Sequence, residues 1–201
     1  MLDKMKILFF ADTHGDDKAL EVLRNRAKDV DGIVCAGDIS IMERDLKKVM
    51  KKLNSFGKPL LMIHGNHEDE EGLKDLCEKH ENITFLHKGV YNIGDYVFLG
   101  YGGGGFSTND PRFEEVAEKF FKPEVKDKKK IIMVTHGPPH GTIIDNMDGD
   151  FRGNKSYRKF MDEVKPHLFV SGHLHETAGK HEKIGRTLVL NPGPTGFVVD
   201  I

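Results

Sequence analysis

Residues 7–14 read ILFFADTH: an apolar run from Ile7 to Ala11 is followed at once by Asp12, Thr13 and His14. A short apolar run that ends in polar residues suits a fully buried β-strand better than a helix, which needs roughly ten residues or more. The segment therefore predicts a core strand that delivers an aspartate and a histidine just beyond its carboxyl end.

The same pattern of a short apolar run followed by polar residues recurs four times along the chain. The runs are Ile33–Ala36 before Gly37-Asp38, Leu60–Ile63 before His64–His67, Ile131–Thr135 before His136, and Leu168–Ser171 before Gly172–His175. Each run predicts another buried strand with candidate functional side chains at its end.

Helical patterns separate the first of these runs. They extend from Asp16 or Asp17 to Arg26, from Glu43 to Leu53, and from Gly72 to about His80. Strands that alternate with helices predict an α/β architecture in which the polar groups gather at the carboxyl ends of the strands.

A second sheet is expected from the middle and the end of the chain. Two antiparallel hairpins are predicted, one from Val90–Ile93 and Tyr96–Tyr101, the other from Ala178–Ile184 and Thr187–Leu190. Helices are predicted over Asp110–Phe121, closed by Pro123, and over Lys155–Val164, closed by Pro166. Because no internal repeat or change of composition marks a linker, we expect residues 1–201 to form a single domain.

The composition narrows the functional classes. The 30 basic and 32 acidic residues leave a formal charge of −2, which favours neither a broad nucleic-acid surface nor an anionic membrane as the partner. No apolar segment is long enough for a signal peptide core or a membrane span, so we expect a cytoplasmic protein without a membrane partner. The oligomeric state stays open.

Histidine is the residue type in surplus, with 11 His against 2 Cys. Cys35 and Cys77 lie far apart, which excludes a disulfide framework and a thiolate zinc site. The pairs Asp12/His14 and His173/His175 are each two residues apart, so in extended backbone both members would project to one side and grip one ion. Alone, either pair also fits a capping aspartate or a core histidine, but five such strand ends together favour a metal centre.

The order of the motifs adds a resemblance to a known family. They are D-x-H at 12–14, G-D at 37–38, G-N-H-E at 65–68, a single histidine at 136 and G-H-x-H at 172–175. This order is similar to that of the calcineurin-like metallophosphoesterase superfamily. The resemblance implies a four-layer α/β/β/α sandwich of two mixed β-sheets flanked by helices.

The resemblance also implies a set of site residues. One metal ion would be held by Asp12, His14, Asp38 and His175, and a second by Asp38, Asn66, His136 and His173, with Asp38 shared. His67 matches the family's catalytic histidine, which contacts the phosphoryl oxygen or protonates the leaving group. A hydroxide that bridges the two ions would attack phosphorus in line.

The chemistry of these side chains limits the metal. Imidazole, carboxylate and amide donors without sulfur favour two divalent transition-metal ions, with Mn as the first expectation and Fe, Zn, Ni or Co as alternatives. Two loop residues, His140 and Arg152, are candidate substrate contacts, and each has an ordinary loop role as the alternative. Glu68 is expected to support its own loop rather than bind metal.

Other segments carry weaker signals. The loop Gly102–Gly105 lacks the Lys and Ser/Thr of a phosphate-binding P-loop, so a flexible loop is the simpler interpretation. Five further histidines match no motif and are expected to have no shared role. They are His64, His80, His87, His167 and His181.

The resemblance implies a phosphoesterase acting on a small phosphate ester, with a phosphodiesterase as the first expectation. The superfamily's protein phosphatases carry G-D-x-x-D-R-G, whereas Ile39–Arg44 follows Asp38 here without that arrangement. A phosphomonoesterase is the main alternative. A scaffold of this fold that binds proteins without turnover is a further one, although such members tend to lose the catalytic histidine or metal ligands, which this sequence keeps.

Overall fold

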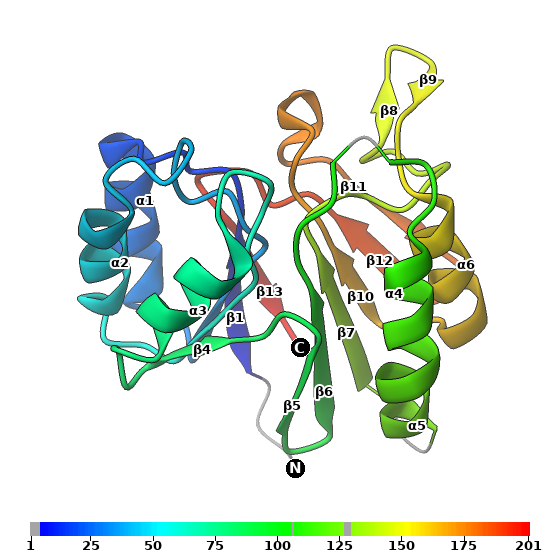
Figure 1. Ribbon diagram of the computed structural model, residues 1–201, viewed down its shortest axis with the longest axis horizontal. Coiled ribbons are helices and arrows are strands. Elements are labelled where there is room, and N and C mark those ends of the chain that lie inside the picture. Colours follow the sequence, from blue (N-terminus) through cyan, green and yellow to red (C-terminus); the bar gives the residue numbers. More distant parts are fainter. Residues whose placement is uncertain (1–4, 106, 127–129) are drawn as a thin grey trace.

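The computed structural model describes residues 5–105, 107–126 and 130–201, and its main feature is a pair of β-sheets packed face to face (Figure 1). The first sheet has the strand order β13-β1-β2-β3-β4. Its strands are β1 (Lys6–Phe10), β2 (Gly32–Cys35), β3 (Leu60–Met62), β4 (Ile83–Phe85) and β13 (Phe197–Asp200). β1 to β4 are parallel, and β13 pairs antiparallel with β1, so the sheet is mixed.

The second sheet has the strand order β11-β12-β10-β7-β6-β5. Its strands are β5 (Gly89–Ile93), β6 (Tyr96–Tyr101), β7 (Lys130–Thr135), β10 (Leu168–Val170), β11 (His181–Ile184) and β12 (Thr187–Leu190). The four central strands are parallel and both edge strands are antiparallel. Both predicted hairpins therefore form, and each supplies one edge of this sheet.

Helices cover the outer face of each sheet (Figure 1). The helices α1 (Asp17–Ala27), α2 (Leu46–Asn54) and α3 (Glu70–Cys77) pack on the first sheet, and α4 (Pro111–Val116), α5 (Lys122–Val125) and α6 (Lys155–Val164) on the second. Shorter elements are the π-helix η1 (Ala117–Phe121), the 3₁₀ turn η2 (His175–Thr177) and a small hairpin of β8 (Asn146–Met147) and β9 (Asp150–Phe151). The expected four-layer α/β/β/α sandwich of two mixed sheets is thus confirmed.

The alternation of side chains along each strand explains why this arrangement is stable. In β1, Leu8 and Phe10 pack toward the helices, whereas Ile7 and Phe9 point between the two sheets. All four side chains are buried, because both faces of the strand are covered. The layer between the sheets is a further apolar core, to which β7 contributes Val134 and β10 contributes Val170.

Two features of the chain depart from the sequence-based expectations. Pro123 does not close the fourth predicted helix, which continues through η1 into α5 and ends at Val125. The widened π turn, in which Lys122 N–H donates to Ala117 O, lets the proline enter without breaking a regular helical ladder. The strands β4 and β13 were not predicted, because neither segment has a long apolar run.

Among the described residues, no helix combines the length and apolar character needed to cross a bilayer.

The layer between the sheets predicts a large effect for Phe9→Ala. Phe9 is fully buried there, so the substitution is expected to lower the free energy of unfolding by about 3–5 kcal/mol. Urea unfolding measures the change, and Phe120→Ala is the control because Phe120 is 55% exposed. Equal losses in the two variants would contradict a core between the sheets.

Candidate active site

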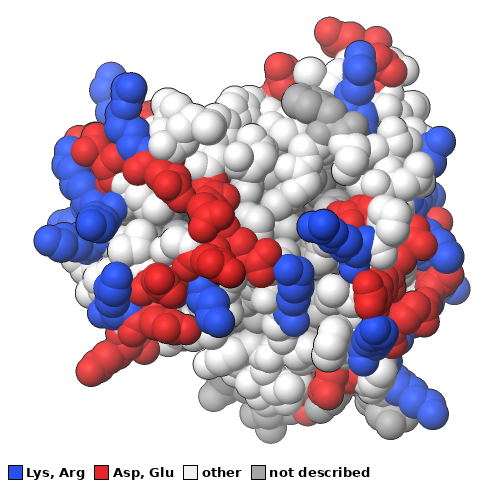
Figure 2. Space-filling model, in the orientation of Figure 1, with Lys and Arg blue, Asp and Glu red and all other residues white. Residues whose placement is uncertain are grey.

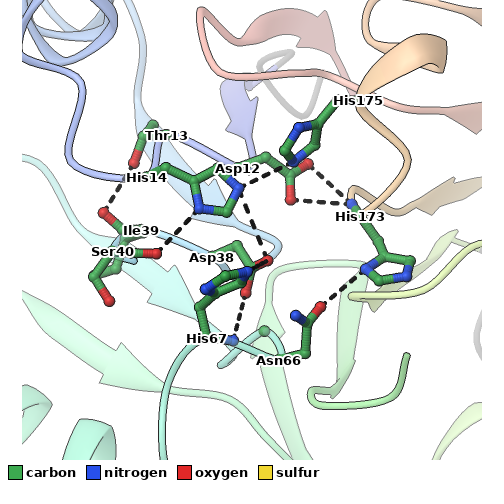
Figure 3. Close-up of polar contacts among 12 residues, drawn as sticks. Asp12, Thr13, His14, Asp38, Ile39, Ser40, Asn66, His67, His173 and His175 are labelled. Atoms are coloured by element: carbon green, nitrogen blue, oxygen red, sulfur yellow. Dashed lines mark hydrogen bonds and ion pairs between the residues drawn. The ribbon is translucent and has the colours of Figure 1, made fainter. Parts of the chain in front are cut away.

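Five loops, each following a different strand, bring eight polar side chains together at one end of the two sheets (Figure 3, which labels all of them except His136). They are Asp12 and His14 after β1, Asp38 after β2, Asn66 and His67 after β3, His136 after β7, and His173 and His175 after β10. These are the seven residues predicted as metal ligands together with the predicted catalytic histidine. The first three strands belong to one sheet and the last two to the other, so the cluster spans both sheets.

One group of donors is formed by Asp12, His14 and His175, whose candidate ligand atoms all lie within 4.8 Å of one another. The Nε2 atoms of His14 and His175 are 3.0 Å apart and face each other. His14 Nδ1 lies 3.1 Å from the carbonyl oxygen of Ser40, to which it donates. That bond leaves the lone pair of a neutral His14 on Nε2, where a cation would bind.

A second group is formed by Asn66, His136 and His173. Asn66 Oδ1 lies 2.9 Å from His136 Nε2 and 2.9 Å from His173 Nδ1. His136 Nδ1 donates to Ala36 O at 2.8 Å, so the lone pair of its neutral ring is on Nε2 and faces the amide oxygen. Two lone pairs that face each other repel, so a cation or a proton between Asn66 Oδ1 and His136 Nε2 would remove the repulsion.

The carboxylate of Asp38 lies between the two groups. Its Oδ2 is 4.0 Å from His14 Nε2 and 3.3 Å from His136 Nε2. Burial would raise the pKa of Asp38, but the hydrogen bond and charge of His136 outweigh it and hold the pKa at about 2. Asp38 is therefore a carboxylate at neutral pH. At His173, burial lowers the pKa to about 4, so that ring is neutral.

The backbone of the site residues differs from the extended conformation that we expected. Asp12, His14 and His173 have φ of 57°, 46° and 70°, so the pairs do not share a side by strand alternation. The chain turns sharply at the end of β1 and again after β10, and these turns aim the side chains. Asp38, with φ of 53°, is in the same left-handed region, which non-glycine residues rarely adopt and which is enriched at functional sites.

Close packing of the backbone explains two glycines of the motifs. A Cβ atom on Gly65 would lie 1.9 Å from Asp38 Oδ1, and one on Gly172 would lie 2.4 Å from Asp12 Oδ2. Each glycine thus lets one loop approach a carboxylate held by another loop. His173 N–H then donates to both oxygens of Asp12, at 3.1 and 2.9 Å.

His67 has the opposite hydrogen-bond pattern from the other rings. Its Nδ1 accepts from Met42 N–H at 3.3 Å, so the proton of the neutral ring is on Nε2. That Nε2 lies 3.9 Å from Asp38 Oδ2, and the ring contacts His14 edge to face, with centroids 4.9 Å apart. The side chain is 28% exposed, so solvent reaches the ring.

The family follows from comparison with known proteins. A model of the calcineurin-like phosphoesterases matches residues 5–177. The chain belongs to the calcineurin-like phosphoesterase family. Membership implies hydrolysis of phosphoric esters with divalent metal ions, and the donor cluster agrees with that chemistry.

Two relatives cover most of the chain. An uncharacterized protein of Methanocaldococcus jannaschii, MJ1162, is 31% identical over 99% of this chain and 93% of its own length. The UPF0046 protein K07C11.7 of Caenorhabditis elegans is 27% identical over 96% of this chain and 68% of its own length.

Solved structures share the fold at low sequence identity. The protein TT1561 of Thermus thermophilus has a TM-score of 0.76 and 22% identity, and the match covers 98% of this chain and 95% of that one. A dimetal phosphatase from Danio rerio has a TM-score of 0.69 and 13% identity, with coverages of 96% and 89%. GAP50 of Plasmodium has a TM-score of 0.63 and 12% identity, with coverages of 94% and 71%.

Within this phosphoesterase, Glu68 of the G-N-H-E motif fixes the loops rather than joining the donor cluster. Its side chain is buried and accepts four hydrogen bonds. Oε2 accepts from the backbone of Asp38 and Gly65 at 3.0 and 3.1 Å, and Oε1 accepts from the backbone and hydroxyl of Ser40 at 2.9 and 2.8 Å. The supporting role expected for Glu68 is confirmed.

The substitution Glu68→Gln is expected to weaken both folding and metal binding. An amide has one acceptor oxygen, so buried N–H groups of Asp38 or Gly65 lose their partner, at about 1–3 kcal/mol for each. Urea unfolding and calorimetric titration with Mn²⁺ measure the two effects. Glu71→Gln is the matched control because Glu71 lies in the first turn of α3, away from these loops, and a similar loss there would refute the assignment.

The two predicted substrate contacts lie in the segment between β7 and α6. The ring of His140 packs edge to face on Phe151, and its Nδ1 is 3.7 Å from the buried carboxylate of Asp145. Arg152 follows β9 and forms an ion pair with Asp150, with its side chain 56% exposed. Their roles in substrate binding remain predictions.

A histidine cluster that the motifs did not indicate lies beside the loop of Asn66. The rings of His64 and His87 are 4.6 Å apart, and Glu70 Oε2 is 3.3 Å from His87 Nε2. Their spacing would suit a metal ion, but His87 Nδ1 accepts from Gly102 N–H at 2.6 Å, which places the ring proton on Nε2. Lys88 also neutralises Glu70, at 2.9 and 3.0 Å. The cluster is therefore a hydrogen-bonded contact between the two sheets.

Metal uptake is expected to release protons from the site. Burial disfavours a charged His136 ring, but the hydrogen bond and charge of Asp38 outweigh it and raise the pKa of His136. A cation must displace the proton of a charged His136 ring. Metal affinity should therefore rise with pH, and the rise should continue above about pH 6.5, the pKa of a free histidine.

Calorimetry in buffers of different ionisation enthalpy counts the protons released on Mn²⁺ binding. His136→Asn should reduce that number, whereas His181→Asn should not, because His181 lies in β11 outside the donor cluster. An affinity for Mn²⁺ that does not change with pH would contradict the prediction.

Proposed function

We propose that this protein is a phosphodiesterase that uses two divalent metal ions, with Mn as the first candidate. The position of the Asp38 carboxylate carries the proposal, because it lies between two groups of nitrogen and oxygen donors and also faces His67 Nε2. Asp12, His14, Asp38 and His175 would hold one ion, and Asp38, Asn66, His136 and His173 the other.

The donor set fits such ions. In the neutral form of either ring, His14 or His136 has its lone pair on Nε2, because a backbone carbonyl accepts from Nδ1. Two divalent ions against the carboxylates of Asp12 and Asp38 leave a surplus of positive charge, which suits an anionic ester. When bound, such ions polarise the phosphoryl group and lower the pKa of bound water from about 15.7 to about 7.

His67 supplies a proton at a defined atom. Because Met42 N–H occupies Nδ1, the ring donates through Nε2 toward the position of the ester. There it would either hydrogen-bond a phosphoryl oxygen or transfer its proton to the leaving oxygen. Asp38 Oδ2 lies 3.9 Å from this Nε2.

A small substrate agrees better with the surface than a long polyanion does. Basic and acidic side chains intermingle on the face shown in Figure 2, as the formal charge of −2 suggests. We therefore favour a small phosphate ester over a nucleic-acid duplex as the substrate.

Two other functions remain as alternatives. A phosphomonoesterase would use the same residues and differ only in substrate. A non-catalytic scaffold is suggested by the neighbour described as GAP50, the anchor in the inner membrane complex of Plasmodium. Retention of His67 together with all seven donor residues favours an enzyme.

His67→Ala is expected to lower kcat by about 10²–10⁴-fold on an alkyl phosphodiester in Mn²⁺, since proton transfer or charge stabilisation is lost. Metal content, measured by mass spectrometry, should not change. His80→Gln serves as the control because His80 lies outside the donor cluster, beyond the end of α3. Wild-type rates in His67→Ala, or full activity after exhaustive chelation, would rule out the mechanism.

His67→Gln separates the two roles of His67, because its amide N–H can hydrogen-bond a phosphoryl oxygen but cannot transfer a proton. If His67 only hydrogen-bonds, this variant should recover activity on both aryl and alkyl diesters. If it is a proton donor, the alkyl ester should stay slow in this variant, whereas the aryl ester should be slowed little by either substitution, because an aryl oxide leaves without protonation. Matched mono- and diesters then establish the substrate preference.

A further inference from the structure

The loop Ile41–Asp45, which links β2 to α2, has an unusual backbone. Met42, Glu43 and Asp45 have φ of 47°, 61° and 56°, in the left-handed region that non-glycine residues rarely adopt. The loop also exposes Ile41 and Met42, at 49% and 73%. Strained backbone of this kind persists where the surroundings hold it, and it clusters at ligand-binding sites.

Two hydrogen bonds hold the loop against the active site. Met42 N–H donates to His67 Nδ1 at 3.3 Å, and Glu43 Oε1 accepts from Asp69 N–H at 3.0 Å, at the start of α3. The loop conformation is thus coupled directly to the ring that we propose as the proton donor.

A cavity of about 250 Å³ lies between this loop and the helices α1 and α2. His14 forms part of its wall, so the cavity begins beside the donor group of the first metal position. Its other lining residues include Asp17, Arg44, Asp45, Lys48 and Lys52. The volume suits a phosphate or a phosphorylated sugar and is smaller than the roughly 300–1,000 Å³ of sites that enclose a whole ligand.

The charges in the cavity favour an anion. Lys52 is paired with Asp17 at 2.5 Å, which neutralises both. Arg44 and Lys48, in contrast, take part in no ion pair within the described part of the chain, although the charge of Lys48 also acts on Asp17, and Asp45 is the other acid that lines the cavity. An arginine can bind a phosphate through two parallel hydrogen bonds, which a surface lysine alone cannot do.

We propose that Arg44 and Lys48 form a subsite for a second phosphate of the substrate, distinct from the phosphate that is hydrolysed. This inference rests on the proposed function, and it narrows the substrates to phosphodiesters that carry a further phosphate group. The subsite lies on the His14 side of the metal positions and selects substrates by KM rather than by kcat.

The test compares two substrates that differ only in that phosphate: the p-nitrophenyl ester of thymidylate, and the same ester with an additional phosphate on its sugar. Release of p-nitrophenol reports diester cleavage in both. For the wild type, the additional phosphate should lower KM by about tenfold, the value of one charge-assisted contact, with kcat nearly unchanged.

The double variant Arg44→Gln/Lys48→Gln should remove this advantage and leave the KM of the simpler ester within about twofold of wild type, because that ester does not reach the subsite. Arg44→Lys with Lys48 intact should keep part of the KM advantage, because the new lysine retains the positive charge. Lys159→Gln is the control, since it removes a charge from α6 on the opposite side of the sandwich. Equal effects on the two esters would overturn the inference.

Binding without turnover separates this inference from the proposed function. Calorimetric titration with thymidine bisphosphate and with thymidylate gives Kd for each protein, and inorganic phosphate alone tests whether a free anion fills the subsite. If neither ester is hydrolysed but the Kd difference depends on Arg44 and Lys48, the proposed function fails and the subsite stands. If the bisphosphate has no advantage in the wild type, or free phosphate binds as tightly, the inference is wrong.

Discussion

The buried carboxylate of Glu68 is the constraint on which the site depends. Each of its oxygens accepts two hydrogen bonds, and the donors come from the loop after β2 and the loop after β3. A buried carboxylate without such donors would be costly, so its presence forces the two loops into one arrangement. That arrangement brings Gly65 within contact of the Asp38 carboxylate and directs His67 N–H to the same carboxylate at 2.9 Å. Glu68, which is not a metal ligand in our proposal, thus positions both the central ligand Asp38 and the proposed proton donor His67.

The cluster is also an interface between two sheets, which makes its geometry depend on how the sheets pack. His173 from the second sheet donates its backbone N–H to Asp12 of the first, and His136 donates to the carbonyl of Ala36. On the far side of the cluster, Gly103 N–H donates to His64 O at 3.0 Å. These contacts surround the donor groups and tie the apolar layer between the sheets to the spacing of the metal positions. Substitutions in that layer are therefore expected to change the geometry of the active site, although the side chains of the layer are not among the metal donors.

The sequence predicted most of what the apolar runs and motifs encode. Short runs such as Ile7–Ala11 located the strands that carry the donors, and the motif order indicated the two-sheet fold. The helix Lys155–Val164 was predicted because Pro166 closes it, and in the structure Asn154 caps its first turn. What failed depended on tertiary structure: the left-handed turns at Asp12 and His173, the π turn before Pro123, and the edge strand β4, whose pairing with β3 compensates for a weak local pattern. His64 and His87 escaped prediction for the same reason, since their ring contact joins the segments after β3 and β4, and Gly102 N–H, after β6, donates to His87.

The direction of a single backbone hydrogen bond distinguishes two of the proposed metal-binding histidines, His14 and His136, from the one that donates a proton in our proposal. At His14 and His136 a backbone carbonyl accepts from Nδ1, so Nε2 has the lone pair when the ring is neutral. At His67 a backbone N–H occupies Nδ1, so Nε2 carries the proton. The strained conformation of Met42 turns that N–H toward the ring, and a relaxed loop would leave the tautomer of His67 free. Composition counts all 11 histidines alike. Their chemistry is assigned by the peptide groups beside them, and that assignment exists only in the folded chain.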